Sequence, residues 1–235
     1  MFVASQLEEE IPDEGLARGE GCFFAQTRLP TRYGALDVRI YVDQQGKEHL
    51  AISTGEIRKA RDLPVRIHSE CLTGEVLGST KCDCKQQLEV ALNSLQMSGC
   101  GLVLYLRQEG RGIGLANKIR AYALQEQGHD TVDANHLLGL PDDARTYEAA
   151  ALMLRQLEVS SVLLMTNNPA KIEALRHLGI EITGRIPLVI RSDNEQVASY
   201  LATKQARMGH LLEDAEGPAP TSAAQVSGPS KKVVC

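Results

Sequence analysis

From residue 83 onward the sequence alternates between segments of helical periodicity and short apolar segments, and this alternation constrains the fold more than any other feature. Four apolar residues recur at helical spacing within residues 83–98, and the apolar run GLVLYLRQ at 101–108 follows. This pattern predicts a helix and then a buried strand. Because strands separated by helices pack as a sheet covered by helices, we predict an α/β fold.

The preceding segment is predicted to be rich in strands. Residues 36–43 alternate between apolar and polar side chains, residues 44–48 supply a turn, and residues 49–54 form a returning strand. Residues 65–70 form another short strand. The expected fold is therefore α/β with α+β-like character, in which a β-rich N-terminal part contributes to a mixed sheet with flanking helices.

Further elements follow from the same signals. A second buried strand is expected over residues 161–168. Helices are expected over 113–127, ended by Gly128, over 143–159 with Asp142 or Asp143 as N-cap, over 169–179 with Pro169 in the first turn, and over about 195–212.

The two ends of the chain differ in composition from its centre. Residues 1–20 are acidic and poor in large apolar residues, and residues 214–235 are rich in Pro, Ala, Ser and Gly, which is typical of disorder. We expect one catalytic domain over residues 21–213. Residues 1–15 do not resemble a signal peptide, and no apolar run approaches the roughly 18 residues of a membrane span. A soluble, cytoplasmic protein without a membrane partner is expected.

Charge narrows the range of partners. The formal net charge is −5, whereas a general nucleic-acid binder normally carries a basic surface. We therefore expect no nucleic acid as partner. A single small polyanion held in a local basic pocket remains compatible with this charge.

Three of the six cysteines form a compact pattern, in which ten residues lie between Cys71 and Cys82 and one residue lies between Cys82 and Cys84. Zinc prefers thiolate and imidazole ligands, and a catalytic zinc has three protein ligands plus water. The spacing therefore predicts a metal site. The alternative is that these are buried free thiols. His68 is a possible fourth ligand, which would make the site purely structural.

A glycine-rich turn joins the strand at 101–108 to the following helix and contains Glu109, Gly110 and Arg111. Glycines let backbone amides approach a ligand closely, and a helix N-terminus favours anions. The spacing matches neither a P-loop nor the dinucleotide fingerprint. A carboxylate can accept hydrogen bonds from the N1–H and 2-amino edge of guanine, so Glu109 is a candidate base reader. A simple tight turn is the alternative.

Taken together, three stretches of the chain resemble GTP cyclohydrolase II. They are RIHSECLTGEVLGSTKCDC at 66–84, LYLRQEGRGIGLANKIRAYALQEQGHDTVDANHLLGL at 104–140 and LLMTNNPAKIEAL at 163–175, and the similarity extends from about residue 28 to 212. The resemblance implies a homodimer that uses zinc and magnesium to convert GTP into a diaminopyrimidinone nucleotide, formate and pyrophosphate. This is the first step of riboflavin biosynthesis.

The resemblance also assigns roles by position. It implies zinc held by Cys71, Cys82 and Cys84, with water in the fourth place. It implies catalytic roles for Asp143 as proton acceptor, Arg145 as nucleophile and Tyr122 in complete turnover. The residues expected to line the nucleotide site are Arg66, Ile67, His68, Ser69, Glu70, Gln87, Glu109, Gly110, Arg111, Thr131, Thr166 and Lys171.

Several alternatives stay open at this point. Arg145 attacks the α-phosphorus, or it stabilises the triphosphate electrostatically without a covalent bond. Lys85 stands where the family usually has Gly, and it either partly neutralises the thiolates or points to solvent. The chain completes the reaction, stops at a formamidopyrimidine, or senses guanine nucleotides with a structural zinc.

Overall fold

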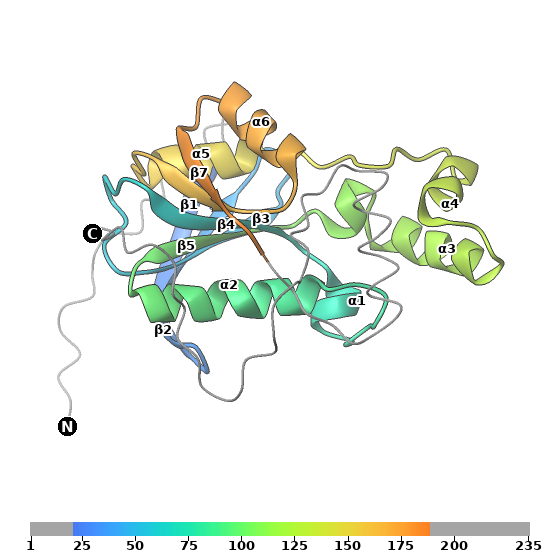
Figure 1. Cartoon of the computed structure of the whole chain (residues 1–235), viewed down its shortest axis with the longest axis horizontal. Helices are drawn as coiled ribbons and strands as arrows, with labels where there is room; N and C mark the ends of the chain where they lie inside the picture. The colour runs from blue at the N-terminus through green and yellow to red at the C-terminus, as the bar shows by residue number, and fades with distance from the viewer. Residues whose placement is uncertain (1–20, 189–235) are drawn as a thin grey trace, which may run out of the picture.

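The computed structural model describes residues 21–188, which form one sheet with helices on both faces (Figure 1). The strands are β1 (Cys22–Thr31), β2 (Gly34–Val42), β3 (Glu48–Thr54), β4 (Leu63–Ser69), β5 (Gly101–Leu106), β6 (Val162–Met165) and β7 (Ile182–Ile186). The helices are α1 (Leu72–Glu75), α2 (Cys84–Ser98), α3 (Leu115–Glu126), α4 (Thr131–Leu137), α5 (Glu148–Gln156) and α6 (Pro169–His177), with a 3-10 turn, η1 (Glu109–Gly112).

The sheet is mixed and is divided into two halves by strand direction. Within the described residues its order is β1-β2-β3-β5-β4-β6-β7. The strands β1, β2, β3 and β5 pair antiparallel in that order, and β5, β4, β6 and β7 pair parallel. The predicted α/β fold, with a β-rich N-terminal part and a mixed sheet, is confirmed.

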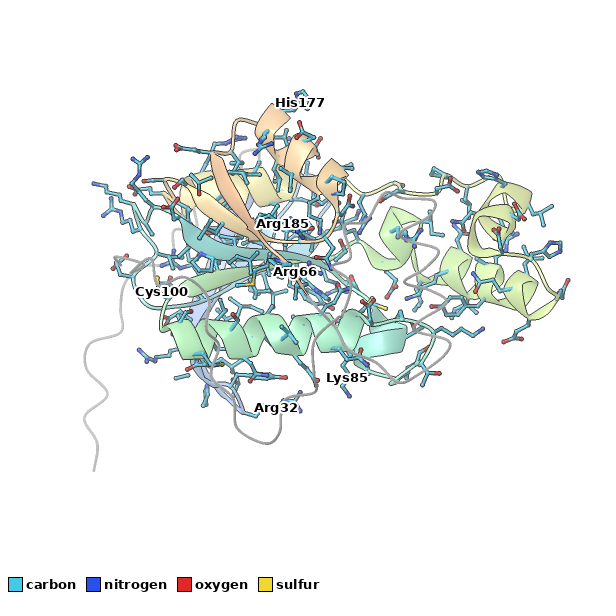
Figure 2. All side chains as sticks on the ribbon, viewed as in Figure 1. Arg32, Arg66, Lys85, Cys100, His177 and Arg185 are labelled. Atoms are coloured by element: carbon cyan, nitrogen blue, oxygen red, sulfur yellow. The ribbon has the colours of Figure 1, made fainter. Side chains whose placement is uncertain are left out.

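Both faces of the sheet are covered, and β4 shows how they differ. In Figure 1, α5 and α6 lie on one face and α2 lies on the other. Val65 and Ile67 are fully buried in the larger apolar core, together with residues of α5 and α6. Because side chains alternate along a strand, Arg66 and His68 point to the opposite face, and Arg66 lies between the sheet and α2 (Figure 2). Polar side chains of β4 are thereby held beside a helix.

Within residues 21–188, the helices and strands expected from periodicity are observed, apart from one helix start. The helix predicted over 143–159 is observed only as α5, which begins at Glu148 after Tyr147, so neither Asp142 nor Asp143 caps it. Asp143 instead accepts hydrogen bonds from the backbone N–H and guanidinium of Arg145. The backbone N–H of Ala144 donates to a neighbouring loop rather than to a helix.

Other expectations fall outside the described residues, namely the flexible ends at 1–20 and 214–235 and the helix at about 195–212. The strands β1 and β7 and the short helices α1 and α4 are additions that the periodicity did not indicate. Within the described part of the chain, no helix has both the length and the apolar character needed to cross a membrane.

Candidate active site

A pocket lies where the carboxyl ends of the parallel strands β4, β5 and β6 meet. Side chains that follow parallel strands gather at one edge of a sheet, and ligands commonly bind there. The predicted site residues that line this pocket are Arg66, His68, Ser69, Glu70, Cys71, Cys82, Cys84, Gln87, Glu109, Gly110, Arg111, Tyr122, Arg145, Thr166 and Lys171. Segments far apart in the sequence thus converge on one cavity.

Three predicted residues stand apart from this lining. Ile67 packs its side chain into the core, and its carbonyl oxygen accepts a hydrogen bond from Lys171 Nζ at 2.8 Å. Asp143 reaches the pocket through its ion pair with Arg145. Thr131 begins α4, and its side chain lies outside the part of the chain that the structure describes.

The three cysteines form a cluster that fits a metal ion. Their sulfur atoms all lie within 4.8 Å of one another, and the Sγ atoms of Cys71 and Cys82 are 3.6 Å apart. A tetrahedral zinc with Zn–S bonds of about 2.3 Å separates its sulfurs by about 3.8 Å. Cys84 is the first residue of α2, and the loop after α1 brings Cys82 beside Cys71. The donor set and its spacing therefore match zinc.

Gly74 is the residue whose size permits this cluster. A Cβ at this position would lie 2.8 Å from the Sγ atom of Cys82 and 3.2 Å from that of Cys71. Atoms this close to sulfur would displace it. The absence of a side chain at Gly74 thus leaves the space in which two of the ligand atoms converge.

The three thiols of the cluster influence one another's pKa values. Hydrogen bonds with Cys82 and Cys84, together with the nearby ammonium of Lys118, hold the pKa of the Cys71 thiol well below its ordinary value, although burial opposes this. The contact with Cys71 raises the pKa of both Cys82 and Cys84. Cys71 and Cys82 are buried. Cys71 also contacts the polar groups of Lys118 and Thr73.

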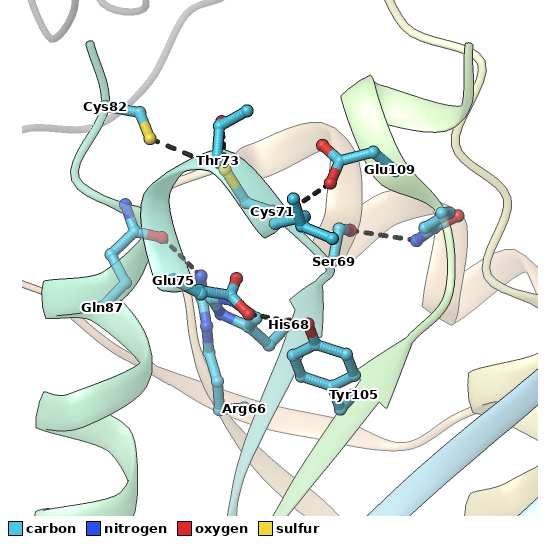
Figure 3. A network of polar contacts seen from close by, with 12 residues as sticks. Arg66, His68, Ser69, Cys71, Thr73, Glu75, Cys82, Gln87, Tyr105 and Glu109 are labelled. Carbon is cyan, nitrogen blue, oxygen red and sulfur yellow. Dashed lines mark hydrogen bonds and ion pairs between the residues drawn. The ribbon is translucent and has the colours of Figure 1, made fainter. Parts of the chain in front are cut away.

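His68 has a partner other than the metal cluster (Figure 3). Its Nε2 atom lies 2.8 Å from Glu75 Oε1, and Tyr105 donates its hydroxyl to Glu75 Oε2 at 2.6 Å. The rings of His68 and Tyr105 are stacked, with centroids 5.7 Å apart. Burial lowers the pKa of His68, although Glu75 opposes this. Among the described residues, the group that could hold a metal ion consists of the three cysteines without His68.

Glu109 is bound on both carboxylate oxygens by groups of the chain itself. Its Oε2 atom accepts from the backbone N–H of Leu72 at 2.6 Å. Its Oε1 atom accepts from Gly110 N and from Lys118 Nζ, each at 2.8 Å. Glu109 thus ties the turn after β5 to the start of α1. Its predicted role as guanine reader stays a prediction, and it would require these contacts to be shared or exchanged.

Arg66 joins β4 to α2 and β6. Its guanidinium donates to Gln87 Oε1 at 2.6 Å and to the carbonyl of Met165 at 3.0 Å. Gln87 donates in turn to Asp83 at 2.6 Å. Burial lowers the pKa of Arg66 to about 10, with the charge of Asp83 opposing. The Nε atom of Arg66 is buried without a hydrogen-bond partner in the described structure, so one donor of this cation remains unsatisfied beside the pocket.

Asp143 and Arg145 form the ion pair that the resemblance singles out. Arg145 Nε lies 2.8 Å and 3.1 Å from the two carboxylate oxygens, and a second guanidinium nitrogen also contacts Asp143. Burial raises the pKa of Asp143, but the hydrogen bonds and charge of Arg145 outweigh it and hold the pKa below its ordinary value. Asp143 is therefore an ionised partner that fixes the guanidinium.

The segment that carries this pair is attached to the turn after β5. Ala144 N donates to Arg111 O at 2.9 Å, and Thr146 N donates to Gln108 Oε1 at 3.3 Å. Gly112 permits the close approach, since a Cβ there would lie 2.6 Å from the carbonyl oxygen of Ala144. Arg111 itself has a φ of 59°, an unusual conformation for a side-chain-bearing residue and one that clusters at functional sites.

Thr166 and Lys171 flank the start of α6, where exposed amides are expected to suit a phosphate. The structure uses two of those amides internally, because Asn168 N donates to Thr166 Oγ1 and Ala170 N donates to Asn168 Oδ1, each at 3.0 Å. Lys171 is buried and lies 5.5 Å from the centroid of Tyr147. The Nζ atom of Lys171 donates to the carbonyl oxygen of Ile67, so its positive charge is fixed in the wall of the pocket at this corner.

Lys85, the departure from the family pattern, is exposed on α2 and points away from the sheet (Figure 2). The ammonium beside the cysteines belongs instead to Lys118 of α3, which is 9% exposed. Helical periodicity marks Lys118 only as a polar residue on an amphipathic helix. Asn135 of α4, which also lines the pocket, carries no local signal either. Lys118 and Asn135 are recognised as pocket residues only from the positions of α3 and α4 in the folded structure.

Comparison with known proteins identifies the family of this chain. Residues 23–187 match the family GTP cyclohydrolase II. A GTP cyclohydrolase-2 of Acinetobacter baylyi is 52% identical over 195 residues, covering 81% of this chain and 96% of that protein. Those of Neisseria gonorrhoeae and Picrophilus torridus are 49% and 48% identical, each over 81% of this chain and over 96% and 98% of their own lengths.

Among solved structures, a two-domain 3,4-dihydroxy-2-butanone 4-phosphate synthase from A. baumannii is similar at 18% identity and a TM-score of 0.43. The match covers 73% of this chain and 41% of that one. The sequence relationships span most of the chain and include the segments that build the pocket. The chain therefore belongs to the GTP cyclohydrolase II family and is a hydrolase of that type.

Proposed function

We propose that the chain hydrolyses GTP at C8 of the guanine ring and releases formate and pyrophosphate. The product is 2,5-diamino-6-(5-phosphoribosylamino)pyrimidin-4(3H)-one, and the reaction opens riboflavin biosynthesis. The observation that carries the proposal is the convergence of two chemistries on one pocket. Three sulfurs suited to a metal lie in the same cavity as Arg145 and Lys171, which suit a triphosphate. Ring opening and pyrophosphate release require both.

Zinc is the proposed resident metal, held by Cys71, Cys82 and Cys84, one ion per subunit. A zinc with three protein ligands keeps an open position and supplies an activated water at neutral pH. His68 does not complete the coordination in this proposal, because its Nε2 atom is engaged with Glu75. The pairing favours a catalytic site over the structural zinc of a nucleotide sensor.

The chain's own cations are proposed to bind the triphosphate together with Mg²⁺. Lys171 and Arg145 lie at the pocket, and a guanidinium can contact two phosphate oxygens at once. Asp143 holds Arg145 by its Nε edge and keeps it oriented toward the pocket. Because the lowered pKa of Asp143 makes it a weak base, this geometry favours electrostatic stabilisation of the leaving pyrophosphate over attack by a deprotonated Arg145.

Recognition of the guanine base is assigned to the turn after β5, where Glu109, Gly110 and Arg111 line the pocket. Tyr122 and Glu70 are proposed to transfer protons during ring opening and deformylation. Burial raises the pKa of Tyr122, which keeps its hydroxyl protonated and able to donate. The presence of this tyrosine favours complete turnover over arrest at the formamidopyrimidine. A homodimer in the cytoplasm is the proposed state of the enzyme.

The test is incubation of the purified chain with GTP, Mg²⁺ and Zn²⁺, with formate and pyrophosphate assayed together and the product identified by mass. Equal amounts of both are expected. Pyrophosphate without formate indicates the formamidopyrimidine alternative, and nucleotide binding without either product indicates a sensor. Cys84→Ser is expected to abolish zinc binding and formate release. If that variant keeps both, the assignment of the metal site is wrong.

A further inference from the structure

Lys118 is a buried cation placed between two anions of the pocket. Its Nζ atom donates to Cys71 Sγ at 3.1 Å and to Glu109 Oε1 at 2.8 Å. The residue is 9% exposed, and its stem contacts the turn after β5, since a Cβ on Gly110 would lie 3.1 Å from Lys118 Cβ. One ammonium therefore bridges the thiolate cluster and the turn that faces the substrate.

This bridge resolves an electrostatic conflict. Three thiolates around a divalent metal leave a net negative centre, and the same ammonium also contacts the Glu109 carboxylate. Two anions facing each other at low exposure repel strongly, and an intervening cation removes that cost. The contacts of Glu109 with Leu72 N and Gly110 N anchor the bridge to α1 and η1.

We propose that Lys118 is a positioning residue of the metal centre, which stabilises the Cys71 thiolate as a ligand and couples it through Glu109 to the substrate-binding turn. The proposal rests on the proposed function, in which the three cysteines hold the metal. A partner of a ligand tunes the metal as well as orienting the ligand, and loss of such a partner typically costs about 10–100-fold in metal affinity or activity.

Lys85 provides a matched control. It follows the ligand Cys84 directly in sequence, yet it is exposed on the outer side of α2 (Figure 2). If any nearby lysine sufficed to offset the thiolates, both lysines would matter equally. Of these two lysines, the geometry assigns the role of offsetting the thiolate charge to Lys118.

The experiment loads the full chain with Co²⁺ and records the sulfur-to-cobalt charge-transfer band. A cation near sulfur lowers the energy of its lone pairs, so Lys118→Met is expected to keep the metal and move the band to longer wavelength. Lys118→Arg is expected to stay close to the wild type, and Lys85→Met to match it. Activity with Zn²⁺ is expected to fall about 10–100-fold in Lys118→Met and to stay unchanged in Lys85→Met.

Glu109→Gln supplies a result of opposite sign. Once the carboxylate charge is removed, the ammonium of Lys118 interacts more strongly with Cys71. The band is therefore expected to move to shorter wavelength. If Lys118→Met does not fold, the band position of Glu109→Gln tests the proposal instead. An unchanged band in Glu109→Gln then overturns the proposal. A band in folded Lys118→Met identical to that of the wild type also overturns it. A wild-type chain that shows no sulfur-to-cobalt band overturns the metal site itself, and with it the proposed function.

Discussion

The two halves of the sheet contribute unequally to the site. The parallel half, formed by β5, β4, β6 and β7, supplies the pocket through the segments that follow its strands. The antiparallel half, formed by β1, β2 and β3 against β5, supplies none of the predicted catalytic or metal-binding residues. Parallel strands bring all their carboxyl ends to one edge, whereas antiparallel strands send successive ends to opposite edges. Strand direction therefore decides where the chemistry gathers.

Burial follows the same division. Every residue of β4 except Ser69 at its end is buried, whereas eight of the ten residues of β1 are exposed. A strand covered on both faces can hold polar side chains such as Arg66 and His68 away from water, where charges act strongly. The exposed edge strand offers no comparable environment. Substitutions in the two halves should therefore differ in both size and kind.

The largest effect is expected at Gly74 of α1, the helix that follows β4 of the parallel half. Gly74→Ala places a Cβ against the sulfurs of Cys71 and Cys82, so we expect loss of bound zinc and an activity decrease of about 1,000-fold or more. Metal analysis and formate release measure it. Val76→Ala, at a position 75% exposed in the same segment, should retain both. Full zinc occupancy in Gly74→Ala would show that the cluster tolerates the added atom.

A smaller effect is expected for Asp143→Asn. The change removes the charge that fixes Arg145, and we expect kcat to fall about 100-fold with zinc content unchanged. Steady-state kinetics and metal analysis test this together. The neighbouring Asp142→Asn is the control, since Asp142 pairs with His136 and not with Arg145. Equal losses in the two variants would contradict a special role for the Asp143–Arg145 pair.

In the antiparallel half, we expect an effect on stability rather than on catalysis. Burial lowers the pKa of His49, although Asp43 opposes this. The stability that neutral His49 contributes is therefore complete above its unfolded pKa of about 6.5 and is lost as pH falls below it. His49→Gln should weaken this pH dependence in urea unfolding. Because the pKa of His68 is lowered in the same direction, part of the dependence should persist, and an unchanged profile would exclude His49 as a source.

The smallest effect is expected on the edge strand. Phe24 is 62% exposed on β1, so Phe24→Ser should change the free energy of unfolding by no more than about 0.5 kcal/mol and leave activity unchanged. Urea unfolding and formate release measure the two quantities. A marked loss of either would indicate that the strand is covered in the assembled protein, which gel filtration of the variant would then test.

The sequence predicted those parts of the molecule that depend on local pattern. Periodicity located β5, β6 and α2, and the cysteine spacing indicated the three cysteines that lie together and could hold a metal ion. The helix start at Glu148 was missed because Asp143 looks like a cap, while its real partner Arg145 lies outside any regular element. β1 gives little signal because an exposed edge strand lacks a buried face.

The comparison of Lys85 with Lys118 shows that local sequence pattern also fails to reveal some contacts within the site. Lys85 draws attention because it adjoins Cys84 in sequence, whereas Lys118 does not, because 33 residues lie between it and Cys84. Distance along the chain is a poor guide once strands, turns and helices fold back on one another. The contact of Lys118 with Cys71 depends on how α3 packs beside η1, which no local pattern encodes.

The attachment of residues 144 and 146 to the turn after β5 has a consequence for substrate affinity. The segment between α4 and α5 has no regular structure, yet its backbone is secured to Arg111 O and to the Gln108 side chain. The conformational entropy of ordering it is thereby lost during folding, before any ligand arrives. In the proposed reaction, GTP would meet a preorganised guanidinium, and more of the interaction energy would remain for binding and for the transition state.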